Sequence, residues 1–224
     1  MGCGLSDKPQ SYNYTLEQHI SNTVSLIDAL DLRNATLVAH DWGGAIGLGA
    51  LLRRETRFKN IVLFNTGAFP PPFIPFRIRV GRWPVFGSIA VRGFNGFAKA
   101  AITMATEQKG GLEKDVAEGL LAPYDNWANR VAIYNFVKDI PLSESHPTWE
   151  TLQNIESKLP PLNDSKQIKL IWGMKDWCFR PECLERFRSY WPSADVTEFS
   201  DAGHYVVEDE SEQIIKLLTK FLKN

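Results

Sequence analysis

An aspartate at the end of an apolar run is the residue of this sequence best placed to do chemistry. Residues 37–39 lead into His40 and Asp41, then come Trp42 and two glycines, and residues 44–52 have the composition of a helix start. A strand that turns this sharply into a helix is typical of a nucleophile elbow, in which one side chain stands clear of a sheet edge. The alternative is an ordinary Asp-Trp-Gly-Gly turn after a strand.

The residue type at the elbow indicates the chemistry. A serine would need a base to become a nucleophile, whereas a carboxylate, with a reference pKa of about 3.9, is already ionised at neutral pH. Asp41 can therefore attack an electrophilic carbon directly and form an alkyl-enzyme ester. The backbone N–H of Trp42 would lie near the ester carbonyl and help to hold the oxyanion when water attacks. The elbow thus predicts an α/β-hydrolase that acts on carbon electrophiles rather than on ordinary esters.

Such a hydrolase needs an acid and a histidine base, in the chain order nucleophile, acid, histidine. Asp176 follows a predicted strand at 168–172, and His204 lies on a loop after a predicted strand at 195–199. Catalytic groups in open α/β sheets gather outside the carboxyl ends of the strands. We therefore predict Asp41, Asp176 and His204 as the catalytic residues. The alternatives are a turn aspartate and a solvated loop histidine.

The other histidines and one asparagine are expected to have no catalytic role. His40 precedes the nucleophile in its strand, where successive side chains point to opposite faces, so it should be buried behind the site. His19 is expected on a polar helix face, and His146 lies in a Ser-His-Pro loop. The rival acid position, after a predicted strand at 60–64, holds Asn65, which cannot carry charge.

Several motifs resemble the haloalkane dehalogenase branch of the α/β-hydrolases, and the resemblance covers nearly the whole chain. Two middle segments look closest to the subgroup that includes the β-lactone decarboxylases of bacterial long-chain olefin synthesis. Soluble epoxide hydrolases share the elbow, so the elbow does not choose the substrate. The branch motifs are residues 2–9 (GCGLSDKP), 40–44 (HDWGG), 172–176 (WGMKD) and 201–205 (DAGHY), and the subgroup segments are residues 65–70 (NTGAFP) and 122–127 (APYDNW).

The resemblance implies a role for each residue of the site. Asp41 would be the nucleophile, His204 would activate water for the second step, and Asp176 would orient the imidazole. Trp42 would act twice, through its backbone N–H on the oxyanion and through its indole N–H on a departing halide. An indole is a donor without an acceptor, which suits an anion.

The predicted fold class is α/β, an α/β-hydrolase fold with a partial parallel sheet and an inserted helical cap. The ranges are 1–69 for the first part of the core, 70–163 for the cap and 164–224 for the second part of the core. Thr15 and Gln18 form a capping box that predicts a helix from Leu16 to Leu30. Two more helices are predicted in the second part of the core, one near 181–190 and a final amphipathic one with six apolar residues on its buried side, Ile214, Ile215, Leu217, Leu218, Phe221 and Leu222.

The predicted cap is rich in proline and aromatic residues and has no clear strand pattern. Most of its aromatic side chains should simply pack in the interior, and a few should line an apolar cavity between cap and core. The candidates for the pocket are Phe69, Tyr124 and Trp127. If the substrate were an epoxide, Tyr124 and Tyr134 would be the tyrosines available to protonate the alkoxide.

Composition is consistent with a soluble enzyme. The chain has 224 residues, 44% of them hydrophobic, and a net charge of −1, so it offers no electrostatic case for nucleic acid or an anionic membrane. No apolar run reaches the 18 or so residues of a membrane span. Cys3, Cys178 and Cys183 are too few and wrongly spaced for a zinc site or a disulfide framework, and we expect reduced thiols in a cytoplasmic protein, with no metal and no cofactor.

The family's opening strands have no counterpart ahead of the motif at residues 2–9. That segment carries a His-Gly-x-Pro stretch with the second oxyanion amide and, in many members, a halide-binding asparagine. We therefore expect a fragment that lacks one oxyanion donor, exposes an apolar sheet edge and is poorly soluble and nearly inactive alone. Residues 1–6 also fit a myristoylation pattern, but the unbroken match through residue 9 favours an interior loop.

Three classes of function remain open at this point. The first is an enzyme that opens carbon electrophiles, with haloalkane dehalogenase ahead of cis-β-lactone decarboxylase and epoxide hydrolase third. Its substrate would be a small apolar haloalkane, β-lactone or epoxide, with water as co-substrate. The second is a ligand-binding pseudo-hydrolase, against which the intact set of three residues argues. The third is an inactive fragment.

Overall fold

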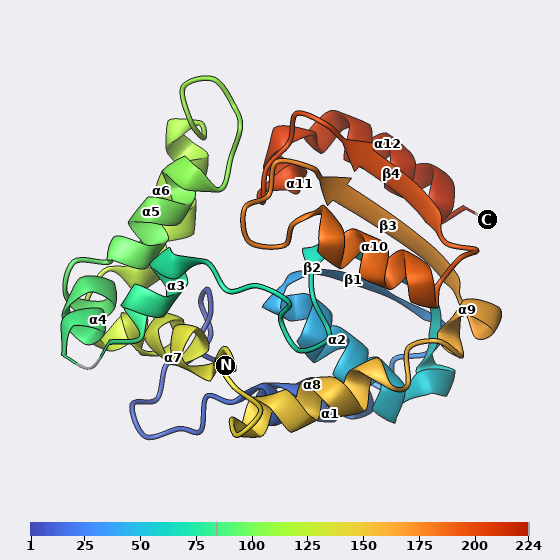
Figure 1. The fold of residues 1–224 in the computed structure, drawn as a ribbon, viewed down its shortest axis with the longest axis horizontal. Coiled ribbons are helices and arrows are strands. Elements are labelled where there is room, and N and C mark those ends of the chain that lie inside the picture. The colour runs from blue at the N-terminus through green and yellow to red at the C-terminus, as the bar shows by residue number, and fades with distance from the viewer. Residues whose placement is uncertain (84, 224) are drawn as a thin grey trace.

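A parallel sheet of four strands forms the centre of the computed structural model, which describes residues 1–83 and 85–223 (Figure 1). The strand order along the sheet is β1-β2-β3-β4, and every neighbouring pair is parallel. This confirms the predicted α/β class. The strands are β1 (Ala35–Asp41), β2 (Phe58–Thr66), β3 (Gln167–Gly173) and β4 (Asp195–Phe199).

Alternate side chains of the inner strand β2 enter two different apolar layers. Ile61 and Leu63 join a large cluster with residues of α1, α2, α8 and α10. Val62 and Phe64 join a smaller cluster on the opposite face, with residues of α11 and α12. A strand buried on both faces has no polar side to show, which explains its continuous apolar run. The helices are α1 (Leu16–Ala29), α2 (Trp42–Arg53), α8 (Pro147–Glu156), α10 (Pro181–Tyr190), α11 (Val206–Asp209) and α12 (Ser211–Phe221).

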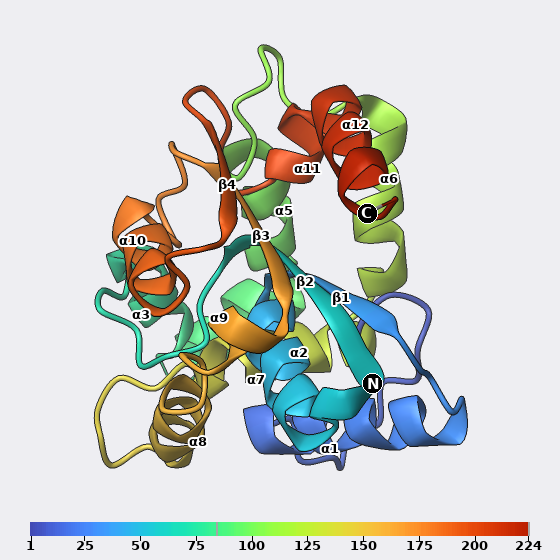
Figure 2. The ribbon, with the colours of Figure 1, turned by 90° about the vertical axis from the view of Figure 1, so that its right-hand side faces the viewer.

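The two faces of the sheet are covered unequally (Figure 2). Helices α1, α2 and α8 contact one another below β1 and β2, whereas α12 packs on the other face mainly through Ile214. The predicted buried side of this last helix is therefore too wide, because Ile215 and Leu222 are 63% and 51% exposed.

Helix α1 starts as predicted, but one of its residues lies elsewhere than expected. The Thr15 hydroxyl accepts the backbone N–H of Gln18, while the Gln18 side chain donates to Asn22 instead of reaching back. His19 is not on a polar face: only 6% of it is exposed, and its ring stacks on Phe136 with centroids 4.6 Å apart.

The chain between β2 and β3 contains helices and turns but no strand among its described residues. Figure 1 shows α3 to α7 gathered to one side of the sheet. Helix α8, by contrast, packs on α1 and α2, so part of the segment 70–163 belongs to the layer under the sheet. The division at residues 70 and 163 stays a prediction. The elements are α3 (Phe76–Gly81), α4 (Phe86–Ser88), α5 (Gly96–Met104), α6 (Lys114–Leu121), α7 (Val131–Asp139) and α9 (Leu162–Ser165), with short turns η1 (Glu55–Arg57), η2 (Ile89–Gly93), η3 (Ala122–Tyr124) and η4 (Ala128–Arg130).

Among residues 1–83 and 85–223, no helix combines the length and the hydropathy needed to cross a bilayer.

Candidate active site

Asp41 ends β1 and immediately precedes α2, in a strained backbone conformation. Its φ of 52° and ψ of −132° lie in a region that residues other than glycine rarely adopt. The Thr66 hydroxyl donates a hydrogen bond to the Asp41 carbonyl. A Cβ added at Gly44 would lie 1.9 Å from the Thr66 hydroxyl oxygen, so the first turn of α2 can approach β2 this closely only with glycine. The geometry is that of a nucleophile elbow.

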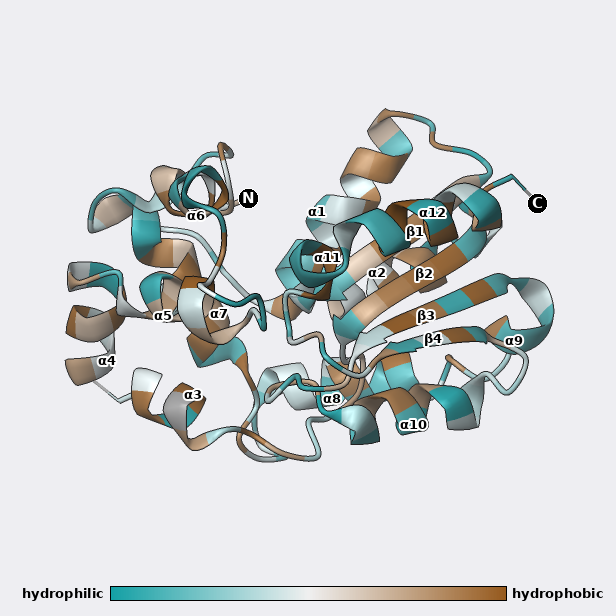
Figure 3. Cartoon of the chain, turned by 90° about the horizontal axis from the view of Figure 1, so that it is seen from above, coloured by the Kyte–Doolittle hydropathy of each residue, from teal (hydrophilic) through white to brown (hydrophobic). Residues whose placement is uncertain are grey.

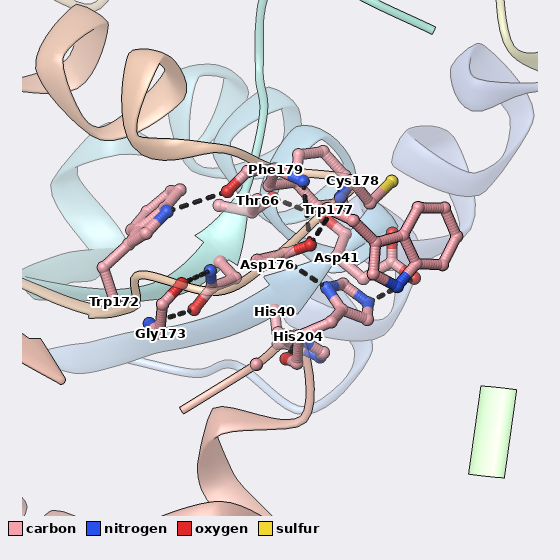
Figure 4. A network of polar contacts seen from close by, with 12 residues as sticks. His40, Asp41, Thr66, Trp172, Gly173, Asp176, Trp177, Cys178, Phe179 and His204 are labelled. Carbon is pink, nitrogen blue, oxygen red and sulfur yellow. Dashed lines mark hydrogen bonds and ion pairs between the residues drawn. The ribbon is translucent and has the colours of Figure 1, made fainter. Parts of the chain in front are cut away.

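Asp176 is held in the turn after β3 and lies against His204. One carboxylate oxygen accepts the backbone N–H groups of Cys178 and Phe179 at 2.6 and 3.1 Å. The other lies 2.8 Å from Nδ1 of His204. The opposite ring nitrogen, Nε2, is 3.6 Å from the Asp41 carboxylate (Figure 4). The structure therefore brings the three predicted residues together in the expected order.

The loop that carries His204 is fixed from three sides. The Gly203 N–H donates to the Asp209 carboxylate at 2.8 Å, and the Tyr205 N–H donates to the Ala105 carbonyl at 2.7 Å. His40 Nε2 lies 2.9 Å from the His204 carbonyl. His40 is thus not buried behind the site as expected: it is half-buried, lines the cavity and supports the backbone of His204.

Asn65, excluded above as an acid, has a structural role at the end of β3. Its side chain is fully buried, its amide donates to the Gly173 carbonyl at 2.9 Å, and its oxygen accepts the Gly173 N–H at 2.7 Å. A Cβ on Gly173 would meet the Gly203 carbonyl at 2.2 Å. This packing brings the turn with Asp176 against the loop with His204. Neither Asn65 nor Asp209 gave a sequence signal for such a role, since both bond backbone groups distant in the chain.

The charges of the three residues depend on one another. Burial lowers the pKa of His204, but its hydrogen bond with Asp176 and the nearby Asp41 carboxylate outweigh that and raise it to about 10. Burial raises the pKa of Asp41, and the interaction with His204 outweighs that and holds it below its usual value. At neutral pH the resting site is therefore an imidazolium between two carboxylates.

A cavity of about 500 Å³ lies above these residues, with mostly apolar walls. Phe69 and Tyr124 line it as predicted, and so does Trp42, whose ring packs on Phe136 with centroids 5.6 Å apart. Trp127 does not: it is 47% exposed, and the Arg92 guanidinium lies 4.7 Å from its ring centroid. The wall residues include Ile78, Phe97, Ile102, Phe136 and Val137.

Two tyrosines add hydroxyl groups to this apolar cavity. The Tyr124 hydroxyl oxygen accepts the Gly4 N–H at 3.1 Å, and the same hydroxyl is hydrogen-bonded with the Cys3 thiol. Tyr205 also lines the cavity, and burial raises its pKa to about 12. The sequence indicated Tyr124 and Tyr134 as the available tyrosines. Tyr134 is outside the cavity lining, and its ring contacts the Lys138 ammonium group. His146 is also outside, at the N-terminus of α8.

Comparison with known proteins agrees with this geometry. The family model for the alpha/beta hydrolase fold matches residues 1–211. A cis-3-alkyl-4-alkyloxetan-2-one decarboxylase of Shewanella oneidensis is 37% identical, over 99% of this chain and 71% of that protein. Haloalkane dehalogenase 2 of Mycobacterium tuberculosis is 27% identical, over 96% of this chain and 73% of that protein.

The crystal structure of haloalkane dehalogenase DatA from Agrobacterium tumefaciens superposes with a TM-score of 0.87 at 24% identity, covering 100% of this chain and 77% of that one. At this identity the likeness concerns the fold. The family match, the decarboxylase relative and the elbow lead to the same conclusion. The chain belongs to the α/β-hydrolase family, with the decarboxylases as close relatives and the haloalkane dehalogenases as more distant ones.

Proposed function

We propose that this protein opens cis-3,4-dialkyl β-lactones through Asp41 and releases carbon dioxide and an alkene. The observation that carries the proposal is an ionised carboxylate on a strained elbow at the floor of an apolar cavity. The decarboxylase relative favours a β-lactone as the electrophile, since its identity is higher than that of the dehalogenase relative. This order reverses the ranking drawn from the sequence alone.

In the first step, a carboxylate oxygen of Asp41 attacks C4 of the lactone, the saturated ring carbon that is bonded to the ring oxygen. The carbon–oxygen bond of the ring breaks, and its electron pair leaves a carboxylate on the substrate. The imidazolium of His204 is the donor that can stabilise this new charge in an apolar surrounding.

In the second step, the bond between the substrate carboxylate and its neighbouring carbon breaks. That electron pair forms the double bond, and the carbon–oxygen bond to Asp41 breaks, so Asp41 is restored as a carboxylate. The products are carbon dioxide and an alkene. No water is consumed, and both oxygens of Asp41 stay in place.

A haloalkane dehalogenase reaction is the second candidate, and Trp42 is the observation that favours it. Its ring lines the cavity, and no described residue is hydrogen-bonded to its indole N–H, so this donor is available to a departing halide. Water would then attack the alkyl ester of Asp41. Esterification removes the charge of Asp41, one cause of the raised pKa of His204, so the imidazole can lose its proton and act as the base.

Heavy-oxygen water distinguishes the two reactions. In the dehalogenase reaction, water attacks the Asp41 carboxyl carbon, so this residue gains solvent oxygen, whereas in the decarboxylation it gains none. The protein would be incubated in this water through many turnovers with a cis-dialkyl β-lactone or with bromobutane. Mass spectrometry would then measure the mass of the tryptic peptide 34–53, which contains Asp41. We expect lactone consumption, alkene formation and no label in this peptide.

Asp41→Asn serves as the control, because it should consume neither substrate. Label in the peptide during lactone turnover, with a hydroxy acid as product, would contradict the decarboxylation. Turnover of bromobutane without turnover of the lactone would establish the second candidate instead.

We place the activity in the cytoplasm, where the three free thiols would stay reduced.

A further inference from the structure

Six large apolar side chains are exposed on α3, α4 and η2 and on the residues next to these elements. Figure 3 shows hydrophobic residues on these helices, at the end of the molecule away from the sheet. Their exposed fractions lie between 46% and 71%. We call them the outer apolar surface, and they are Phe76, Trp83, Val85, Phe86, Ile89 and Phe94.

The elements that carry these side chains contact one another, α3 with α4 and α4 with η2. The rings of Trp83 and Phe86 lie 6.2 Å apart between centroids. Phe86 and Ile89 are three residues apart on the helical stretch formed by α4 and η2, so they share a face. Single exposed apolar residues are ordinary, but a contiguous group of this size marks a binding surface.

The segment that carries the outer apolar surface is rich in basic residues and lacks acidic ones. Between Glu55 and Glu107 the chain has no acidic residue, while residues 70–106 contain five arginines and lysines. Arg79 and Lys99 are exposed, and neither forms an ion pair with a described residue. The near-zero net charge of the whole chain therefore includes a local excess of positive charge in this segment.

The surface also continues into the cavity. Phe73 and Phe97 are 44% and 37% exposed, and both line the cavity as well. They come from the same segment as the outer apolar surface, one before α3 and one in α5. Exposed apolar side chains of this part of the chain thus lie both on the outer surface and at the cavity.

We propose that this surface docks the protein on an anionic lipid bilayer. Exposed aromatic and aliphatic side chains flanked by unpaired basic residues are what a peripheral contact requires: the apolar groups enter the headgroup region and the cations meet the lipid phosphates. An acidic protein partner would share the charge complementarity. The bilayer is favoured because two exposed residues of the same part of the chain, Phe73 and Phe97, also line the cavity that an apolar substrate dissolved in lipid would enter.

Flotation of vesicles through a density gradient tests the proposal, since aggregated protein sinks and bound protein rises. The probes are vesicles of phosphatidylcholine mixed with phosphatidylglycerol and vesicles of phosphatidylcholine alone. We expect binding to the anionic vesicles that weakens in high salt. Phe76→Ser combined with Phe86→Ser should lower the partition coefficient at least about tenfold, and Arg79→Gln should lower it about fivefold.

A matched control removes two apolar side chains that are equally exposed elsewhere. Leu5→Ser combined with Ile215→Ser should float as the unaltered protein does. Brominated lipids should quench tryptophan emission, and Trp83→Phe should remove much of that quenching. Absence of flotation with anionic vesicles, or an equal loss in the control variant, would contradict the proposal. Vesicle binding does not depend on turnover, so this result is independent of the proposed reaction.

Discussion

Two buried histidines differ in charge at neutral pH, and their surroundings explain why. His204 at the cavity floor and His19 in α1 are 8% and 6% exposed. Burial lowers the pKa of both. For His19 the result is a pKa of about 4, whereas the carboxylates around His204 reverse the effect and raise its pKa to about 10. Similar burial thus gives a neutral ring in one place and a cation in the other.

The neighbours of His19 are aromatic rings rather than carboxylates. Its ring stacks on Phe136, with Tyr12 and Tyr14 next to it, and its Nε2 has no hydrogen-bond partner among the described residues. A proton there would be an unpaired buried charge, so the folded protein excludes it. The comparison teaches that the partner, and not the degree of burial, decides whether a histidine of this protein can work as an acid or a base.

Asp41→Asn should give the largest effect. The variant loses the proposed nucleophile, so turnover should fall by roughly 10⁴-fold or more. It also loses one of the two charges that favour the imidazolium, so the pKa of His204 should fall below about 10 while that of His19 stays near 4. Substrate assays and histidine resonances followed by NMR against pH would measure both.

The matched control for this variant is Asp164→Asn, an exposed aspartate in α9. It should change neither turnover nor the titration of His204. An unchanged pKa of His204 in Asp41→Asn would mean that Asp176 alone holds the proton, and the difference between the two histidines would then rest on one carboxylate.

The sequence predicted the positions of the three residues at the cavity floor better than it predicted the surroundings of the histidines. Strand ends are local features, so Asp41, Asp176 and His204 could be placed from apolar runs and the turns after them. The burial of His19 could not, because Phe136, which covers it, lies on α7, more than a hundred residues away. Trp127 and Tyr134 failed for the same reason: composition identifies aromatic residues but not the direction in which short helices point them.

The free energy of unfolding at alkaline pH tests the raised pKa of His204. Its folded pKa of about 10 lies above the unfolded value of 6.5, so its contribution is present in full below pH 6.5 and is lost as pH rises toward 10. Urea unfolding should show a loss on the order of a few kcal/mol between pH 7 and 9.5, since one pKa unit is worth about 1.4 kcal/mol. His204→Gln, compared with itself across this range, should lose less. Equal slopes for both proteins would show that the loss comes from other groups.

The free energy of unfolding at acid pH tests the lowered pKa of His19. The expected effect is smaller, because the pKa shift of His19 is smaller than that of His204. Its folded pKa of about 4 lies below 6.5, so the folded state resists protonation, and the stabilisation present above pH 6.5 is lost as pH falls toward 4. His19→Phe keeps a ring against Phe136 and cannot be charged. It should match the unaltered protein within about 1 kcal/mol at pH 7.5 and exceed it by roughly 1–3 kcal/mol at pH 4.5. His146→Phe, at a half-buried position, should show a smaller difference. If His19→Phe lost stability on acidification as steeply as the unaltered protein, the aromatic surroundings of His19 would not be what keeps it neutral.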